Sequence, residues 1–466
     1  MDAGGSSTDR HGEPGSADRR RLKAALFLLL CGAAGIAPHT LPPGLRLLPA
    51  ALLAVLLGGH GLVTVLRGQR ATAPPPSAAA QSTSTAGPSP VVEVVVAARD
   101  EQAVIARLVE RVTALRWPAG QLRLWVIDDG SEDRTPEVLA DLQTRVPQLR
   151  VLRRPRDAGG GKSGALNLVL RELSGRWLLV LDADADLQPD TLERLIPFAE
   201  AGGWAAVQLR KAVVNAPVNL LTGAQAMEMA FDALIQAGRQ ARGGVGELRG
   251  NGQLLRREAV VASGGFNEST ITDDLDLSLR LVLVGHPVGV LWDPPVGEEA
   301  VLSLRALWRQ RQRWAEGGLQ RFLDHGFGFG SGRLNRFQTL DLFAFFLLQY
   351  AMPVLAAADL AGVLLTGTAP LMWPFSLVAM VSSALGLVAG CRRVQEGPPL
   401  PALNPFHTTV AILYLTHWFV VIPWVSLRMA LLPKRLVWAK TLHLGDEEGP
   451  LAGEAEAELA AGGGQA

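Results

Sequence analysis

The sequence predicts an α/β domain with a mostly parallel β-sheet, inserted between transmembrane helices. Short apolar segments alternate with helical stretches between residues 91 and 300, a pattern typical of a parallel sheet with helices on both faces. Long apolar runs with few charged residues flank this region on both sides, and runs of this length are able to span a bilayer.

Four strands are expected in the first half of the domain, each short and rich in branched or aromatic apolar residues. Their ranges are 91–98, 122–129, 149–154 and 176–184, with helices expected over 101–115 and 135–146. Ligands of parallel sheets bind at the carboxyl ends of the strands. Acidic residues stand at these ends, namely Asp128, Asp129, Asp182 and Asp184.

The N-terminal part is expected to contain a disordered segment, 1–18, a two-helix transmembrane hairpin, 19–70, and a flexible linker, 71–90. Basic residues precede the first apolar run and follow the second one, which places both ends of the hairpin in the cytosol. A signal peptide is the alternative, because the residues at 35–37 resemble a cleavage site.

The C-terminal part is expected to contain an amphipathic interfacial helix in 301–335, transmembrane or interfacial helices in 336–444, and a disordered tail, 445–466. Three apolar runs in 336–444 would leave the C-terminus outside if each of them crossed. The basic residues that follow, Lys434, Arg435 and Lys440, indicate the inside. A last run that is re-entrant or interfacial, with its internal Pro423, would remove this conflict.

Composition excludes several classes of protein. The 44 basic and 44 acidic side chains balance, so bulk positive charge for nucleic-acid binding is absent. Two cysteines provide no disulfide framework or cysteine-rich metal site. The apolar runs carry almost no ionisable residues, which argues against a transport pathway.

Asp182 and Asp184 are the expected metal ligands, because two carboxylates one residue apart at a strand end are able to share one divalent ion. An EF-hand loop is excluded, since Leu187 stands where its sharp turn needs glycine. Surface carboxylates in a turn are the structural alternative.

The glycine-rich segment 157–167 with Lys162 suits a diphosphate, because backbone N–H groups at a helix start and an ammonium group both attract anions. A nucleotide-binding P-loop is excluded, since Arg156 occupies the position of its first glycine. A plain glycine-rich turn is the other interpretation.

Two further clusters carry candidate chemistry. Asp273, Asp274 and Asp276 stand at an expected helix start, where acids cap and stabilise a helix or where one acts as a general base. Gln310, Arg313 and Trp314 lie on the basic amphipathic helix, which is either lipid-facing or supplies an arginine to a leaving phosphate.

Together these motifs, in one order over residues 91–325, resemble the inverting GT-A-fold glycosyltransferases of family 2, the group of cellulose, chitin and hyaluronan synthases. The set comprises the strand end before Glu101, DDGS (128–131), GKSGALN (161–167), DAD (182–184), TDD (272–274) and QRQRW (310–314). A glycosidase would also use two carboxylates but needs no metal pair at a strand end.

The resemblance implies a role for each matching residue. Asp274 would be the catalytic base, with Asp273 in the place of the usual glutamate, so that the choice between the two stays open. Asp184 would bind Mg²⁺ or Mn²⁺, and Asp182 would bind the nucleotide and assist the metal. The resemblance also implies a uridine pocket of Ala98, Glu101, Asp128 and Asp129, with Lys162 holding the diphosphate. Gln310, Arg313 and Trp314 match the family's QxxRW motif, with Arg313 near the diphosphate and Trp314 near the acceptor.

Within the family, the segments at 246–260 and 271–281 resemble the cyanobacterial monoglucosyldiacylglycerol synthases. This implies transfer of glucose from UDP-glucose to the hydroxyl of 1,2-diacylglycerol by an integral protein of a bacterial plasma or thylakoid membrane, with a cytosolic catalytic domain. The alternatives are a processive β-glycan synthase and a non-catalytic nucleotide-sugar sensor.

Overall fold

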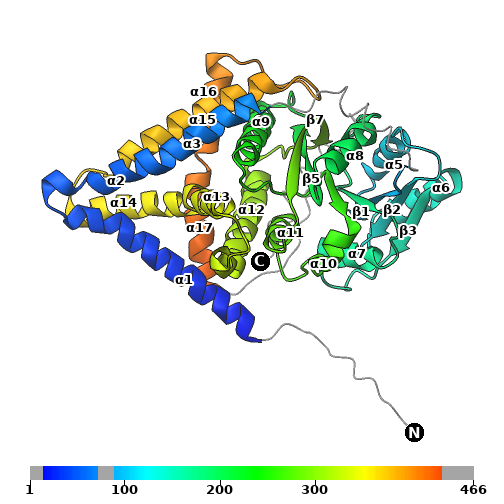
Figure 1. Cartoon of the computed structure of the whole chain (residues 1–466), viewed down its shortest axis with the longest axis horizontal. Coiled ribbons are helices and arrows are strands. Elements are labelled where there is room, and N and C mark those ends of the chain that lie inside the picture. Colours follow the sequence, from blue (N-terminus) through cyan, green and yellow to red (C-terminus); the bar gives the residue numbers. More distant parts are fainter. Residues whose placement is uncertain (1–13, 72–88, 433–466) are drawn as a thin grey trace, which may run out of the picture.

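The computed structural model describes residues 14–71 and 89–432. The expected tail 445–466, most of the linker 71–90 and the basic residues at 434, 435 and 440 lie outside the described residues. The described chain has two parts, a sheet domain and a fan of long helices that meets one side of it (Figure 1).

The sheet domain contains seven strands in the order β3-β2-β1-β4-β6-β5-β7. Only β6 runs antiparallel to its neighbours, so the other strands end at the same edge. The first four strands confirm the expectation, and the last three were not expected from the sequence. The bounds are β1 Val92–Ala98, β2 Leu122–Asp128, β3 Leu149–Arg153, β4 Trp177–Leu181, β5 Ala206–Val213, β6 Gln253–Arg256 and β7 Val288–Glu298.

Central strands are buried on both faces, as the continuous apolar runs predict. Every residue of β1 is buried. Val94 and Val96 belong to one hydrophobic cluster with residues of α5 (Ile105–Thr113), whereas Val95 belongs to another with residues of α7 (Gly161–Leu170). Alternate residues therefore pack against helices on opposite faces of the sheet. This packing holds the strands, and with them the acidic residues at their ends, in place.

The other helices of this part are α6 Thr135–Arg145, α8 Thr191–Ala201, α9 Leu220–Ala241, α10 Arg257–Ala262, α11 Asp273–Leu283 and α12 Leu304–His325. Helix α12 is the amphipathic helix expected in 301–335. It starts where the Ser303 side chain accepts a hydrogen bond from the backbone of Ala306 at 3.2 Å, a standard helix cap.

The helical fan contains five stretches of the described residues that are long and apolar enough to cross a membrane, which indicates membrane association. They are Arg19–Thr40, Pro43–Arg70, Arg336–Thr366, Trp373–Arg393 and Pro405–Leu431. The helices that form them are α1 Pro14–Ile36, α2 Leu48–Leu53, α3 Gly59–Arg70, α13 Arg336–Phe346, α14 Met352–Thr366, α15 Trp373–Arg393, α16 Pro405–Leu415 and α17 Trp418–Leu431.

Helix α1 begins at Pro14, earlier than the boundary expected at residue 19. Extending an existing helix is easier than starting one, and proline suits the first helical turn because it lacks only an N–H that would be unpaired there. Residues 14–18, part of the segment expected to be disordered, are thus the start of this helix.

The fan has a tip and a base. At the tip, His39 lies 2.9 Å from Asp359 in the middle of α14, and Asp359 accepts a hydrogen bond from the backbone of Leu371 just before α15. At the base, Arg393 at the end of α15 donates to the carbonyl of Ala71 after α3 at 2.6 Å.

Both ends of the last apolar stretch lie at the base. Helix α16 packs against α9 of the sheet domain, and the carbonyl of Leu431, at the end of α17, accepts a hydrogen bond from Arg21 near the start of α1 at 3.2 Å. Arg20 on the same turn pairs with Asp324 of α12 at 2.6 Å. The α16–α17 pair thus runs across the open side of the fan and does not reach the tip (Figure 1).

Candidate active site

A cavity of about 1250 Å³ opens where the strand ends meet the helical fan. Ordinary small-molecule sites occupy roughly 300–1,000 Å³, so this one has room for more than one substrate. One end of it is lined by polar residues at the ends of β1, β4 and β7, and the other end by apolar residues of α3, α14, α15, α16 and α17.

Nine of the residues singled out in the sequence line this one cavity. They come from five separate segments of the chain, which the fold brings together at the carboxyl edge of the sheet as expected. They are Glu101, Lys162, Asp182, Asp184, Asp273, Asp274, Gln310, Arg313 and Trp314.

Asp182 and Asp184 directly follow β4. Asp184 is buried, and its Oδ2 accepts a hydrogen bond from the backbone N–H of Glu299 at 2.8 Å. Glu298 lies nearby, and burial raises the pKa of its carboxyl group, with the negative charges of Asp184 and Asp182 adding to the increase.

No cluster of three or more metal-ligating side chains is spaced to hold an ion by itself within residues 14–71 and 89–432. Mg²⁺ typically uses one or two protein carboxylates and completes its shell with substrate phosphates and water. The Asp182–Asp184 pair fits such a shared ion, because it supplies hard oxygen ligands in a region of excess negative charge.

Lys162 is held over the polar end of the cavity by the start of α7. Gly160 precedes this helix with a φ of +69°, a left-handed conformation that glycine adopts without strain. The Lys162 ammonium donates to Asp182 Oδ1 at 2.5 Å. Burial alone would lower the pKa of Lys162, but the carboxylates of Asp182, Asp273 and Asp274 outweigh burial and raise it, so the cation is retained.

Asp273 and Asp274 lie in the first turn of α11, where their negative charges interact favourably with the helix dipole. Both side chains also line the cavity. Burial raises the pKa of both, and the pKa of Asp274 rises to about 6 with the neighbouring Asp273 adding to the effect. Lys162 lowers the pKa of Asp273 more than any other charge does. Lys162 also lowers the pKa of Asp274, so both carboxylates lie in the field of this cation.

Asp276, the third acid of this helix, has a structural role. It pairs with His325 at 2.8 Å and with Arg280 at 2.6 Å, and it joins α11 to the end of α12. Burial alone would raise the pKa of Asp276, but its hydrogen bonds and charges toward His325 and Arg280 lower it.

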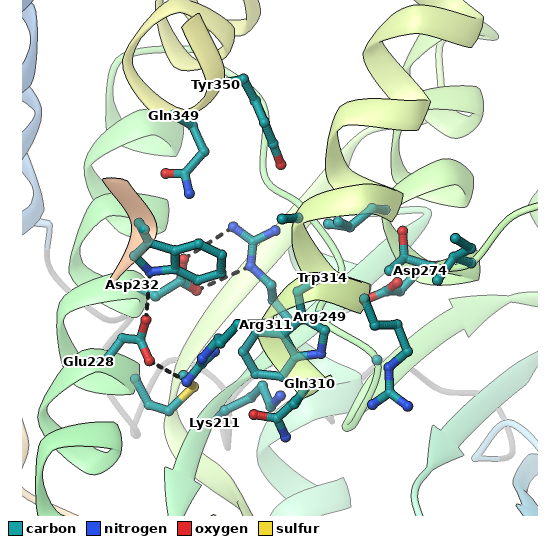
Figure 2. Close-up of a pocket in the computed structure, with 18 of the residues that line it drawn as sticks. Lys211, Glu228, Asp232, Arg249, Asp274, Gln310, Arg311, Trp314, Gln349 and Tyr350 are labelled. Carbon is teal, nitrogen blue, oxygen red and sulfur yellow. Dashed lines mark hydrogen bonds and ion pairs between the residues drawn. The ribbon is translucent and has the colours of Figure 1, made fainter. Parts of the chain in front are cut away.

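Helix α12 presents Gln310, Arg313 and Trp314 to the cavity, and Figure 2 shows Gln310 and Trp314 there. Burial lowers the pKa of Arg313, and the charges of Asp182 and Asp274 partly offset this effect, so Arg313 lies within the electrostatic field of both carboxylates. The Trp314 ring lies 5.2 Å from the Lys211 ammonium and 4.1 Å from the Arg311 guanidinium, so cation–π contacts hold it in place.

Ala98, Asp128 and Asp129 lie at the ends of β1 and β2. They are not among the residues that line the cavity. Asp128 Oδ1 accepts a hydrogen bond from the Ser131 backbone at 2.9 Å, and Asp129 pairs with Arg154 at 3.4 Å. Their expected contact with uridine stays a prediction.

Sequence reasoning missed charged residues on elements that it did not anticipate. Glu298 is the last residue of β7, and Glu299 follows it. Had β7 been recognised in the sequence, the expectation that ligands bind at the carboxyl ends of strands would have identified both residues. The cavity is also lined by the missed residues Lys211, Glu228, Asp232 and Arg249, and by Arg311 of the expected helix α12. Figure 2 shows two ion pairs of this wall, Asp232 with Arg249 and Glu228 with Arg311.

A buried ionic cluster supports this wall from behind. Glu247 is 1% exposed and pairs with Arg239 at 3.2 Å, Arg249 at 3.0 Å and Arg321 at 3.1 Å. Burial alone would raise the pKa of Glu247, but the three guanidinium groups hold it well below its ordinary value. The cluster joins α9, α12 and the loop before β6.

We expect Glu247→Ala to lower the free energy of unfolding by about 3–5 kcal/mol, because it leaves buried arginines without their shared carboxylate. Thermal melting of the purified protein measures this. Glu258→Ala, which removes an exposed carboxylate, is the control and should stay within about 0.5 kcal/mol of the unchanged protein. Equal melting of the two variants would contradict a structural role for the cluster.

The fold resembles a solved glycosyltransferase. The mannosyltransferase PcManGT from Pyrobaculum calidifontis, solved in complex with GDP-Man and Mn²⁺, superposes with a TM-score of 0.57 at 20% identity, over 81% of this chain and 97% of that one. The expected GT-A fold is thereby confirmed.

Sequence comparison identifies the family. The β-monoglucosyldiacylglycerol synthase of Synechocystis sp. is 43% identical over 91% of this chain and 88% of that protein. The synthase of the same name from Nostoc sp. is 41% identical over 92% of this chain and 90% of its own length. Residues 88–317 match the family model described as "Glycosyltransferase like family 2". The chain therefore belongs to glycosyltransferase family 2 and is an enzyme that transfers sugar from a nucleotide-sugar donor.

Proposed function

We propose that the protein transfers glucose from UDP-glucose to the hydroxyl of 1,2-diacylglycerol and forms β-monoglucosyldiacylglycerol. One observation carries this proposal: a single cavity joins the carboxylates at the sheet edge to an apolar end between the membrane-type helices. A neutral lipid acceptor has a hydroxyl group that suits the polar end and hydrocarbon chains that suit the apolar end. The names of the two relatives reported above support the same substrates.

Asp274 is the proposed general base. It takes the proton of the acceptor hydroxyl while that oxygen forms a bond to the anomeric carbon of glucose. The bond from this carbon to the diphosphate breaks, and UDP leaves with the electron pair. A single displacement inverts the anomeric centre, so an α-linked donor gives a β-linked product.

The remaining cavity residues stabilise the departing diphosphate. Lys162 and Arg313 offset its charge in a site where buried charges interact strongly. Asp184 and Asp182 would hold a divalent cation, Mg²⁺ or Mn²⁺, which supplies further charge stabilisation when bound. Trp314 provides a flat wall for the sugar or the acceptor.

The pH profile follows from the pKa of Asp274, which burial raises to about 6. Below this pH the carboxyl group is protonated and has no capacity to accept a proton, so kcat/KM should fall as the pH is lowered through 6 and level off above it. Initial rates across about pH 5–8.5, an interval that includes this pKa, test this. A flat profile down to the lowest pH would contradict a basic role for this group.

We further propose four membrane crossings, by α1, α2–α3, α13–α14 and α15, with α16–α17 along the interface. The protein would then be integral to a bacterial plasma or thylakoid membrane, with the catalytic domain and both termini in the cytosol. The placement of Leu431 beside Arg21 supports this arrangement.

Single cysteines test the arrangement, because Cys31 and Cys391 are both buried. Ala369→Cys at the exposed tip should react with an impermeant maleimide in intact cells, whereas Leu432→Cys should react only after the cells are opened. Labelling of both from outside would show that the last stretch crosses.

A labelled-lipid assay tests the proposed reaction. Purified protein receives radiolabelled UDP-glucose, Mg²⁺ and diacylglycerol, and the lipids are then separated. A labelled lipid with one sugar is expected, and parallel reactions with other UDP-sugars establish the donor. A product that grows in length would instead identify a β-glycan synthase, and donor binding without turnover on any acceptor would identify a sensor.

A further inference from the structure

We propose that the apolar end of the cavity is a chamber that holds the acyl chains of the acceptor lipid inside the protein. We call it the acyl chamber and define it by Leu57 in the helical turn before α3 and by residues of α3, α15 and α17, namely Gly61, Val65, Phe375, Ala379 and Phe419. The identity of its ligand rests on the proposed function.

The chamber is continuous with the catalytic end of the cavity. The same cavity is lined by Asp274 and Trp314 at one end and by these apolar residues at the other. A lipid hydroxyl placed at Asp274 would therefore have its hydrocarbon chains within reach of the chamber.

The chemistry of the lining suits hydrocarbon. Among the described lining residues, those from α3 and from α13 to α17 carry no formal charge, and the polar ones are serine, threonine, glutamine, tyrosine and tryptophan. Burial of acyl chains against such a surface is favourable, whereas a glycan would leave many of its hydroxyls without partners.

A buried arginine marks the boundary between the two ends. Arg311 is 1% exposed and lines the cavity, and its Nη2 donates to Glu228 at 2.5 Å and to the Tyr414 hydroxyl at 2.7 Å. Its Nε and Nη1 groups have no hydrogen-bond partner in the described structure. The guanidinium lies 4.1 Å from the Trp314 ring and 5.5 Å from the Trp418 ring, so Arg311 is enclosed by aromatic side chains where the charged end of the cavity meets its apolar end.

The same contacts hold the chamber closed on one side. The Trp418 indole and the Tyr414 hydroxyl both donate to Glu228, at 3.0 Å and 2.8 Å. The junction of α16 and α17 is thereby fixed to α9 and α12 beside Trp314. This explains why the last apolar stretch lies across the open side of the fan.

Gly61 offers a way to fill the chamber. A Cβ at this position would meet nothing within 4 Å, although the residue lines the cavity. Gly61→Leu would therefore place a side chain in the space of the acyl chains. Gly59 begins the same helix, also has nothing within 4 Å and is exposed on the outer surface, so Gly59→Leu is the matched control.

The experiment measures glucose transfer to dioleoylglycerol and to the shorter dioctanoylglycerol in mixed micelles. Gly61→Leu should reduce kcat/KM for dioleoylglycerol by about tenfold or more, with a smaller loss for dioctanoylglycerol and unchanged affinity for UDP. Gly59→Leu should match the unchanged protein with both lipids. Equal activity of Gly61→Leu and Gly59→Leu on dioleoylglycerol would overturn the chamber while leaving the proposed function intact.

A second measurement does not depend on turnover or on these variants. A diacylglycerol that carries a diazirine within one acyl chain is photolysed with the full-length protein, and the labelled peptides are sequenced. Labelling should fall on the chamber residues of α3 and α15. Labelling confined to outward-facing residues such as Leu364 would overturn the chamber, whereas failure of the unchanged protein to glucosylate any diacylglycerol would overturn the proposed function.

Discussion

Asp274→Asn should reduce glucose transfer by about 10²–10⁴-fold, the range that a positioned general base contributes. Asparagine keeps the shape of the side chain but has no capacity to take the acceptor proton. The affinity for UDP-glucose should survive, because Lys162, Arg313 and the Asp182–Asp184 pair remain. Initial rates and equilibrium binding of UDP measure the two effects separately.

Asp273→Asn is the matched comparison, since it changes the adjacent carboxylate on the same turn. We expect a smaller loss of rate, because Lys162 lowers the pKa of Asp273 more than any other charge does and so makes this carboxylate a weaker base. Burial raises the pKa of Asp274 above its value in the unfolded chain, so its ionised form destabilises the fold at neutral pH. Asp274→Asn should therefore melt no lower than the unchanged protein. A larger loss for Asp273→Asn would identify Asp273 as the base.

Asp184→Asn should reduce transfer by about 10³-fold, because a bound cation contributes several kcal/mol of charge stabilisation and each 1.36 kcal/mol is tenfold in rate. An asparagine oxygen is still able to accept the hydrogen bond from the Glu299 backbone, so the loop should keep its conformation. The rate is measured as a function of Mg²⁺ and Mn²⁺ concentration.

Asp186→Asn is the control for this variant. Asp186 belongs to the same loop, but its carboxylate is partly exposed and pairs with Arg111 at 2.8 Å. It should retain full activity. Chelation with EDTA should abolish transfer by the unchanged protein, and added Mg²⁺ should restore it. Activity that persists in EDTA would contradict a role for Asp184 in holding a cation.

The sequence predicted the parts of the fold that depend on local pattern. Strands β1, β2 and β4 consist mainly of apolar residues, β2 and β4 lead directly into acidic residues, and α12 combines a serine cap with an amphipathic pattern. Strands β5 to β7 escaped prediction because their sequences carry polar and charged residues, such as Gln208, Arg210 and Asp293, that find partners only in the folded protein. Arg210, for example, pairs with Asp293 at 2.8 Å.

The site was predicted wherever a short motif carries the chemistry. Lys162, Asp184 and Asp274 were all located from local spacing, and the structure places them in one cavity. Glu228 and Arg311 were not found, since their partnership joins residues far apart in the chain, and no local pattern encodes it. The path of α16–α17 was left open for a similar reason. Hydropathy reports how apolar a segment is, whereas contacts at both of its ends decide its direction.

The anomeric configuration of the lipid product tests the central claim most directly, namely that Asp274 drives one displacement in a cavity shared by the sugar nucleotide and a lipid hydroxyl. Proton NMR of the purified glucolipid made from α-linked UDP-glucose and diacylglycerol distinguishes the two anomers. A single β-linked glucose is the expected result. An α-linked glucose would contradict the account, because it requires a second displacement for which the proposed mechanism provides no nucleophile.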